Sequence, residues 1–156
     1  MTPYDLICDL RCGLAEHLKS YKLPPQNGQP RPIKVMALKM PANPLDEKLY
    51  PLVFIELNGV QDNADKSIAQ VLISVGTYST DELINGQVDL LNIMQEVRKY
   101  LLTHRLIGAA SFNFPLESIL VESDSAEFFF AQIVAEYRIG APTNNYLDEY
   151  DLEDTI

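Results

Sequence analysis

The sequence predicts an α+β fold, with a mainly antiparallel sheet and two main helices packed on one face of it. Two segments place apolar residues at the spacing of a helix, and several shorter segments have the alternation or the apolar run of a β-strand. Their order is one helix, two or three strands, a second helix and two strands. Strands grouped as hairpins beside two helices are typical of this fold class.

The chain has 156 residues, and we expect one domain over residues 1–142 followed by an acidic arm over residues 143–156. A Pro-rich loop and strand region, residues 22–48, lies within the domain. The arm interleaves carboxylates with a few tyrosines and leucines, which is too little apolar content to pack by itself. This composition is typical of an arm that becomes ordered on a partner.

The first helix is predicted at the N-terminus, where Thr2 can act as the cap and Pro3 suits the first helical position. Asp5 then lies where a carboxylate meets the unpaired N–H groups of the first turn. Apolar residues follow at helical period, namely Ile7, Leu10, Leu14, Leu18 and Tyr21. The prolines of residues 23–32 end this helix.

Strands are predicted at residues 33–39, 52–59, 68–79, 112–122 and 127–139. A Pro-punctuated loop over residues 40–51 is long enough to project from the domain. Asn58-Gly59 is the turn signal after the second strand, and residues 60–67 are expected to form a polar loop. The last two strands are joined by the polar turn at residues 123–126.

The second helix begins at Gly86 and is the best-supported element of the prediction. Its apolar positions follow an i, i+4, i+7, i+11 pattern, at Leu90, Met94, Val97 and Leu101. Gly108 is a plausible stop for this helix.

Composition argues against a nucleic-acid-binding protein and against a membrane protein. The net charge is −10 and the twelve Lys and Arg residues are scattered along the chain, whereas binding to phosphates needs them clustered. No apolar run approaches the roughly 18 residues of a membrane span. Because the N-terminus also lacks the cationic region of a secretory signal, we expect a cytosolic protein.

Known catalytic and metal-binding patterns are not met. Gly76 and Gly86 are too far apart for a nucleotide loop, and Asp81 and Glu82 between them would repel phosphate. Cys8 and Cys12 provide two thiols where structural zinc needs four ligands, so we interpret them as free thiols. The two histidines have no nucleophile signature beside them. We therefore expect no enzyme, no cofactor and no metal.

Three segments, taken in order, resemble the tail terminator (tail completion) proteins of tailed bacteriophages: "YPLVFIEL", "SIAQVLISVGTYSTD" and "GQVDLLNIMQEVRKYLL". The likeness covers roughly residues 50–139 and includes the later Phe-x-Phe-Pro-Leu strand. Two features differ, since family members often have an aromatic residue where this chain has Gln87, and they tend to carry Trp in the final strands. These differences leave open a neighbouring class, the head–tail joining proteins of the neck.

The resemblance implies a structural virion protein that is assembled in the host cytoplasm. Six copies would form a ring on the end of the tail tube, stop its polymerisation and present the other face to the head-proximal neck or connector protein. DNA would then pass through the ring without sequence-specific binding. A rival from another class is a monomeric ligand-binding or enzymatic domain, which would have a single pocket and no self-association.

A ring needs a heterologous interface, in which one surface meets a different surface of the next copy. An edge strand and projecting loops suit this role. We expect the loop from Tyr78 to Gly86 to position the second helix and meet a neighbouring subunit or partner. The candidate interface residues are Tyr78, Thr80, Asp81, Glu82 and Gly86, with Tyr146, Tyr150 and Leu152 of the arm.

Reversing the charges of Asp81 and Glu82, or deleting the chain from Asn144 onward, is predicted to impair assembly while the fold survives. These residues are assigned to contacts with neighbours, so their loss should leave the core intact. Tail length and head joining are the measurements, with circular dichroism as the check on folding. Normal tails joined to heads in both variants would count against these assignments.

Overall fold

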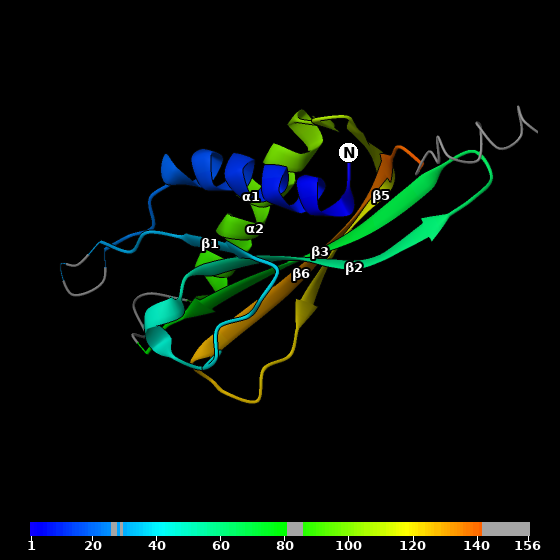
Figure 1. Cartoon of the computed structure of the whole chain (residues 1–156). Helices are drawn as coiled ribbons and strands as arrows, with labels where there is room; N and C mark the ends of the chain where they lie inside the picture. Colours follow the sequence, from blue (N-terminus) through cyan, green and yellow to red (C-terminus); the bar gives the residue numbers. More distant parts are fainter. Residues whose placement is uncertain (26–27, 29, 81–85, 142–156) are drawn as a thin grey trace, which may run out of the picture.

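Two helices lie on one face of a twisted sheet in the computed structural model, which describes residues 1–25, 28, 30–80 and 86–141 (Figure 1). The elements in chain order are α1 (Pro3–Lys19), β1 (Lys34–Ala37), the short 3₁₀ helix η1 (Glu47–Leu49), β2 (Leu52–Asp62), β3 (Ser67–Tyr78), α2 (Gly86–Thr103), β4 (Leu106–Ile107), β5 (Ala110–Val121) and β6 (Phe128–Ile139). The predicted α+β class is confirmed.

The sheet of the described residues has six strands in the order β1-β2-β3-β6-β5-β4. Only β1 and β2 are parallel, and all other neighbours are antiparallel. The centre is the pairing of β3 with β6, which runs without a break from Ser67 opposite Ile139 to Tyr78 opposite Phe128. The predicted mainly antiparallel sheet is therefore confirmed.

The core lies between the helices and the sheet face that they cover, which we call the helix face. Alternate residues of the two central strands point into it and are fully buried, among them Val71, Ile73 and Ile133. The helices contribute the residues of their apolar stripes, including Leu10, Leu14 and Val97, also fully buried. Burying a side chain of this size stabilises the fold by about 1.5–3 kcal/mol.

The start of α1 agrees with the prediction in detail. The Asp5 N–H donates to Thr2 Oγ1 at 3.1 Å, and the Thr2 N–H donates to the Asp5 carboxylate at 2.8 Å. This reciprocal capping box satisfies two backbone donors that the helix itself leaves unpaired.

One predicted turn signal is wrong. Asn58-Gly59 does not end the second strand, because β2 continues to Asp62 and absorbs the pair through a register shift between Leu57 and Gly59. The Asn58 side chain donates to Gln70 across the ladder and so supports the strand. The predicted polar loop at residues 60–67 is consequently reduced to a tight turn, where the Asn63 N–H donates to the Lys66 carbonyl at 2.7 Å.

Gly108 does not end the second helix either. The helix ends at Thr103, where side chains bind its last carbonyls: Thr103 Oγ1 donates to Lys99 and Arg105 Nε to Leu102. Gly108 instead has φ +59° and forms the turn between β4 and β5. The short strand β4 was not predicted, since two residues are too few to show a period.

Replacing Val97 by Asp is expected to unfold the domain. The side chain is fully buried among apolar residues, so the charge would have no partner, and a loss of about 4–5 kcal/mol or more is large against the usual stability of a domain. Gln95→Asp on the exposed face of the same helix is the matched control. Chemical denaturation of both variants measures the difference, and equal stabilities would contradict this placement of α2.

Candidate interface surfaces

In the described part of the chain the sheet is open at both sides, because β1 has no further strand beside it and β4 covers only the first residues of β5. On one side, β4 pairs only with Ala110 and Ser111, so within the described chain no strand lies beside β5 from Asn113 onward. We call residues 113–122 the β5 edge. On the other side lies β1, and we call residues 34–40 the β1 edge. Open edges present unpaired backbone groups to a partner.

The β5 edge exposes consecutive apolar side chains. Ile119 and Leu120 are each 50% exposed and Val121 is 38% exposed, although all three belong to a strand. Pro115 lies at the irregularity of pairing between Asn113 and Glu117, where an edge strand tolerates a residue without an N–H. The edge therefore offers a partner both apolar surface and backbone hydrogen bonds.

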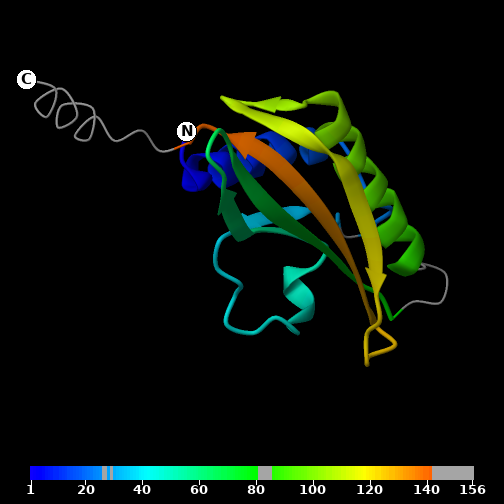
Figure 2. The same ribbon diagram turned by 90° about the vertical axis from the view of Figure 1, so that its right-hand side faces the viewer.

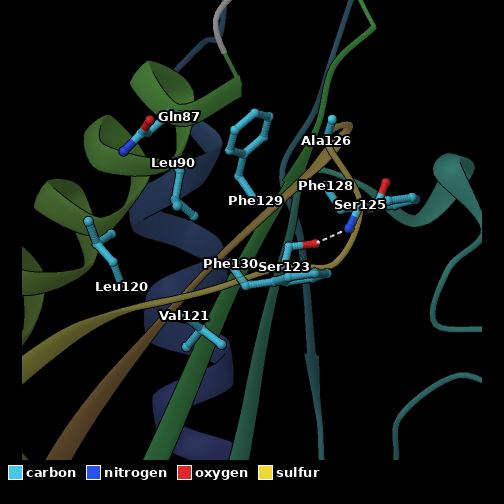
Figure 3. Close-up of a pocket in the computed structure, with 10 residues that line it drawn as sticks. All are labelled: Gln87, Leu90, Leu120, Val121, Ser123, Ser125, Ala126, Phe128, Phe129 and Phe130. Atoms are coloured by element: carbon cyan, nitrogen blue, oxygen red, sulfur yellow. Dashed lines mark hydrogen bonds between the residues drawn. The ribbon is translucent and has the colours of Figure 1, made fainter.

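A hollow of about 280 Å³ lies beside this edge, between the start of α2 and the hairpin of β5 and β6 (Figure 3). Leu120 and Val121 line it from β5, Leu90 and Gln87 from α2, and Phe129 from β6. In Figure 2 the yellow strand β5 runs along the side of the sheet nearest the green helix α2, and residues of both elements line the hollow. This hollow extends the apolar surface of the β5 edge onto the helix side of the sheet.

The β1 edge is also apolar and incompletely covered. Val35, Met36 and Ala37 are only half-buried, and Leu38 is 51% exposed. The N–H groups of Lys34 and Leu38 donate to Pro51 and Ile55 of the β2 side at 3.0 Å. Because alternate residues of a strand point their backbone groups to opposite sides, those of Val35 and Ala37 point away from β2.

The two edges carry opposite charges. Lys34 and Lys39 of the β1 edge are exposed, and the sequence from His17 to Leu45 contains no acidic residue. Glu117 and Glu122 of the β5 edge are exposed, and the sequence from Leu106 to Tyr137 contains no basic residue. Each edge thus has one sign of charge beside exposed apolar residues.

Tyr78, a predicted interface residue, belongs to an aromatic cluster on the sheet face away from the helices. Its ring lies 4.9 Å from that of Phe128, and Tyr50 contacts Phe128 and Phe130 edge-on at 5.2 and 5.9 Å. A hydrogen bond with Glu47, followed by burial and the charge of Glu127, raises the pKa of Tyr78 to about 12.

This cluster fastens the predicted projecting loop to the domain. The loop hangs from the sheet on the side opposite the helices (Figures 1 and 2). The ring of Tyr50 occupies the place where a side chain at Gly76 would lie, with a distance of 2.4 Å to an ideal Cβ. Gly76 is therefore required for the loop to pack on the central strands.

The other predicted interface residues differ in exposure, and some of them lie outside the described residues. Thr80 is exposed at the same end of the sheet as Tyr78. Gly86 is buried: its carbonyl accepts a hydrogen bond of 2.7 Å from Thr77 Oγ1, and the ring of Phe129 covers its Cα. Asp81, Glu82, Tyr146, Tyr150 and Leu152 lie outside the described residues. Sequence reasoning missed the β5 edge, although its unbroken Ile-Leu-Val run departs from the alternation of a half-buried strand.

An ion pair and a contact between a histidine and a carboxylate hold α2 to its surroundings. Arg31 Nη1 lies 3.0 Å from Asp89 Oδ2, with side chains that are 10% and 5% exposed, and Arg31 Nε donates to the Pro24 carbonyl at 2.8 Å. His17 Nε2 lies 3.0 Å from Glu96 Oε2 between the two helices. The first pair holds the Pro-rich region against α2, directly before β1.

Among the described residues there is no group of three or more His, Cys, Asp or Glu side chains that could hold a metal ion. Cys8 and Cys12 are free thiols, as interpreted from the sequence.

No helix in the described part of the chain is long and apolar enough to cross a membrane. The side chains gathered at the two edges are suited to binding a partner.

Comparisons with known proteins give a distant structural likeness. No protein-family model matches the sequence, and no curated protein matches it. Among solved structures, the chain is similar to a chain of the virion of a native gene transfer agent particle, with 13% identity and a TM-score of 0.41. The alignment covers 68% of this chain and 78% of that chain. The resemblance to tail terminators therefore depends on the sequence motifs alone.

Replacing Arg31 by Met is expected to lower the free energy of unfolding by about 3–5 kcal/mol, because it leaves the Asp89 carboxylate buried without its cation. In Arg31→Met/Asp89→Leu both charges are absent, and the loss should be smaller than in the single variant. Arg98→Met, which removes a surface contact with Gln95, is the control and should be close to neutral. A double variant less stable than the single one would contradict this account of the pair.

Proposed function

We propose that this protein is a structural virion protein, the tail terminator of a tailed bacteriophage. Six copies form a ring that caps the tail tube, stops its polymerisation and provides the attachment face for the head-side neck. The observation that carries the proposal is the open sheet, with two different apolar edges on opposite sides. Together with the motifs that resemble the terminator family, it supports a ring of identical copies.

Two different edges on one chain favour a heterologous contact, in which each copy uses one edge for the preceding neighbour and the other for the next. Such a contact closes into a ring when the rotation between copies divides a full turn. An isologous contact would use one edge twice and end as a dimer. The number six comes from the resemblance.

The ends of the sheet remain for the tube and the neck. One end carries Tyr78, Thr80 and the turn between β5 and β6, and the other carries the hairpin of β2 and β3 with Leu106, which is largely exposed. A ring presents one of these ends on each of its faces. Because the two ends have different residues, a tube subunit that binds one face meets a different surface on the other. This difference is what prevents further growth.

The first test is the solution mass of the purified protein by light scattering over a range of concentrations, with electron microscopy of any large species. The proposal predicts a ring of six times the 17.6 kDa protomer, formed alone or on preformed tail tubes. A protein that stays monomeric both alone and with tubes would refute it and favour the monomeric ligand-binding rival.

A second measurement separates the terminator from a head–tail joining protein. In phage that lack this chain, a terminator predicts tubes of uncontrolled length, because nothing covers the growing end. Tails of normal length that fail to join heads would instead assign the protein to the neck.

A further inference from the structure

We propose that the β5 edge of one copy pairs with the β1 edge of the next copy as an antiparallel ladder, which joins the sheets of neighbouring subunits. This inference rests on the proposed ring and specifies its subunit contact. Four observations carry it: the directions of the two strands, the backbone groups they expose, the faces their side chains occupy, and their charges.

The directions of the strands suit an antiparallel contact. β1 runs parallel to β2, and three antiparallel pairings then lead from β2 through β3 and β6 to β5. β5 therefore runs opposite to β1 within one copy. In a ring whose axis follows the strands, rotation preserves these directions, so β5 of one copy meets β1 of the next in the antiparallel sense.

The backbone groups of the β5 edge can be assigned from its neighbours. The Ser79 N–H donates to the Glu127 carbonyl at 2.9 Å, so the odd-numbered residues of β6 point their backbone groups to β3 and the even-numbered ones to β5. Ile119 and Val121 pair with Gln132 and Phe130 and use their backbone groups on that side.

The residues between them, Ser118 and Leu120, therefore point their backbone groups to the open side of β5. On the β1 edge the corresponding residues are Val35 and Ala37. Each strand thus offers two residues whose backbone groups face outward, at the same spacing of two. The Ala37 carbonyl already accepts from the Lys39 N–H at 2.9 Å and has a second lone pair to share. An antiparallel ladder forms when such residues lie opposite one another.

The side chains of these same residues lie on the helix face. Val35 and Ala37 pair with Val53 and Ile55, which are buried beneath α1. Leu120 pairs with the buried Ala131 and lines the hollow beside α2 (Figure 3). Pairing Val35 with Leu120 and Ala37 with Ser118 therefore satisfies the backbone and keeps the helix faces of both copies aligned.

The same register brings Met36 opposite Ile119 on the other face. Lys34 then lies opposite Val121, one residue from Glu122, and Glu117 lies opposite Leu38, one residue from Lys39, so each end of the ladder carries one acidic and one basic residue at neighbouring positions. Lys34 already donates to the Lys48 carbonyl, and its ammonium has three donors to share. Charges at the rim of a contact mainly select the partner and the register.

The alternatives with two identical edges are disfavoured by the same charges. Pairing β5 with β5 brings Glu117 and Glu122 of two copies together, and pairing β1 with β1 does the same for Lys34 and Lys39. Like charges on neighbouring strands are destabilising. The charge pattern consequently selects the contact between different edges, which a ring requires.

The test uses two charge-reversed variants, Glu117→Lys/Glu122→Lys and Lys34→Glu/Lys39→Glu. In each variant alone, both edges of every copy carry the same sign, so at a concentration where the wild type forms rings each should remain at protomer mass. In an equal mixture every junction can join a basic edge to an acidic one. The mixture should regain the ring mass, with the two variants alternating, which is possible because six is even.

The control matched to Glu117→Lys/Glu122→Lys is Glu16→Lys/Asp65→Lys, and the control matched to Lys34→Glu/Lys39→Glu is Lys66→Glu/Lys99→Glu. Each makes the same change in net charge at exposed positions outside both edges and should form rings like the wild type. Circular dichroism establishes that each variant is folded, and Lys39→Glu alone is the substitute if loss of the Lys34 contact disturbs the loop. Wild-type rings with no loss in either variant, or no recovery in the mixture, would overturn the edge pairing and leave the proposed function standing. A wild type that never forms a ring, alone or on tubes, would overturn both.

Discussion

The unbroken pairing of β3 with β6 is the constraint on which the rest of the structure depends. Twelve residue pairs in one register fix which side chains of both strands face the helices, because a slip of one residue would turn every side chain to the opposite face. Val71, Ile73 and Ile133 are then buried on the helix face, while Phe128 and Phe130 take the other face and hold Tyr50. The helices and the loop of residues 40–51 are both positioned by this one ladder.

The outer strands of the sheet are much shorter than this central pair. Beside two twelve-residue strands, β1 has four residues and β4 has two, so neither covers the strand next to it completely. Natural edges are usually shortened, charged or covered against pairing with other chains. Here the β5 edge keeps a long open stretch with exposed Ile119 and Leu120, and in a protein that assembles such a stretch serves as a contact.

Most of the fold could be predicted from the sequence, because the signals involved are local. The capping box of Thr2 and Asp5, the stripe of α2 and the alternation of β6 each depend on neighbours a few residues away. The predictions for Asn58-Gly59 and Gly108 were wrong. Pairing with β3 carries β2 through Asn58-Gly59, and side-chain caps end α2 at Thr103, before Gly108. The edges, the hollow and the pair of Arg31 with Asp89 depend on residues far apart in the sequence, which no local pattern encodes.

Net charge and edge charge act on assembly in opposite directions. At −10 two copies repel one another at long range, and salt weakens this repulsion beyond the Debye length of about 10 Å at 0.1 M. In the proposed junction the acidic and basic edges would attract one another. Net repulsion would then oppose random association, whereas the local charge pattern would favour the proposed contact of β5 with β1. The proposed ring needs this combination, because exposed strands without it would pair in any register.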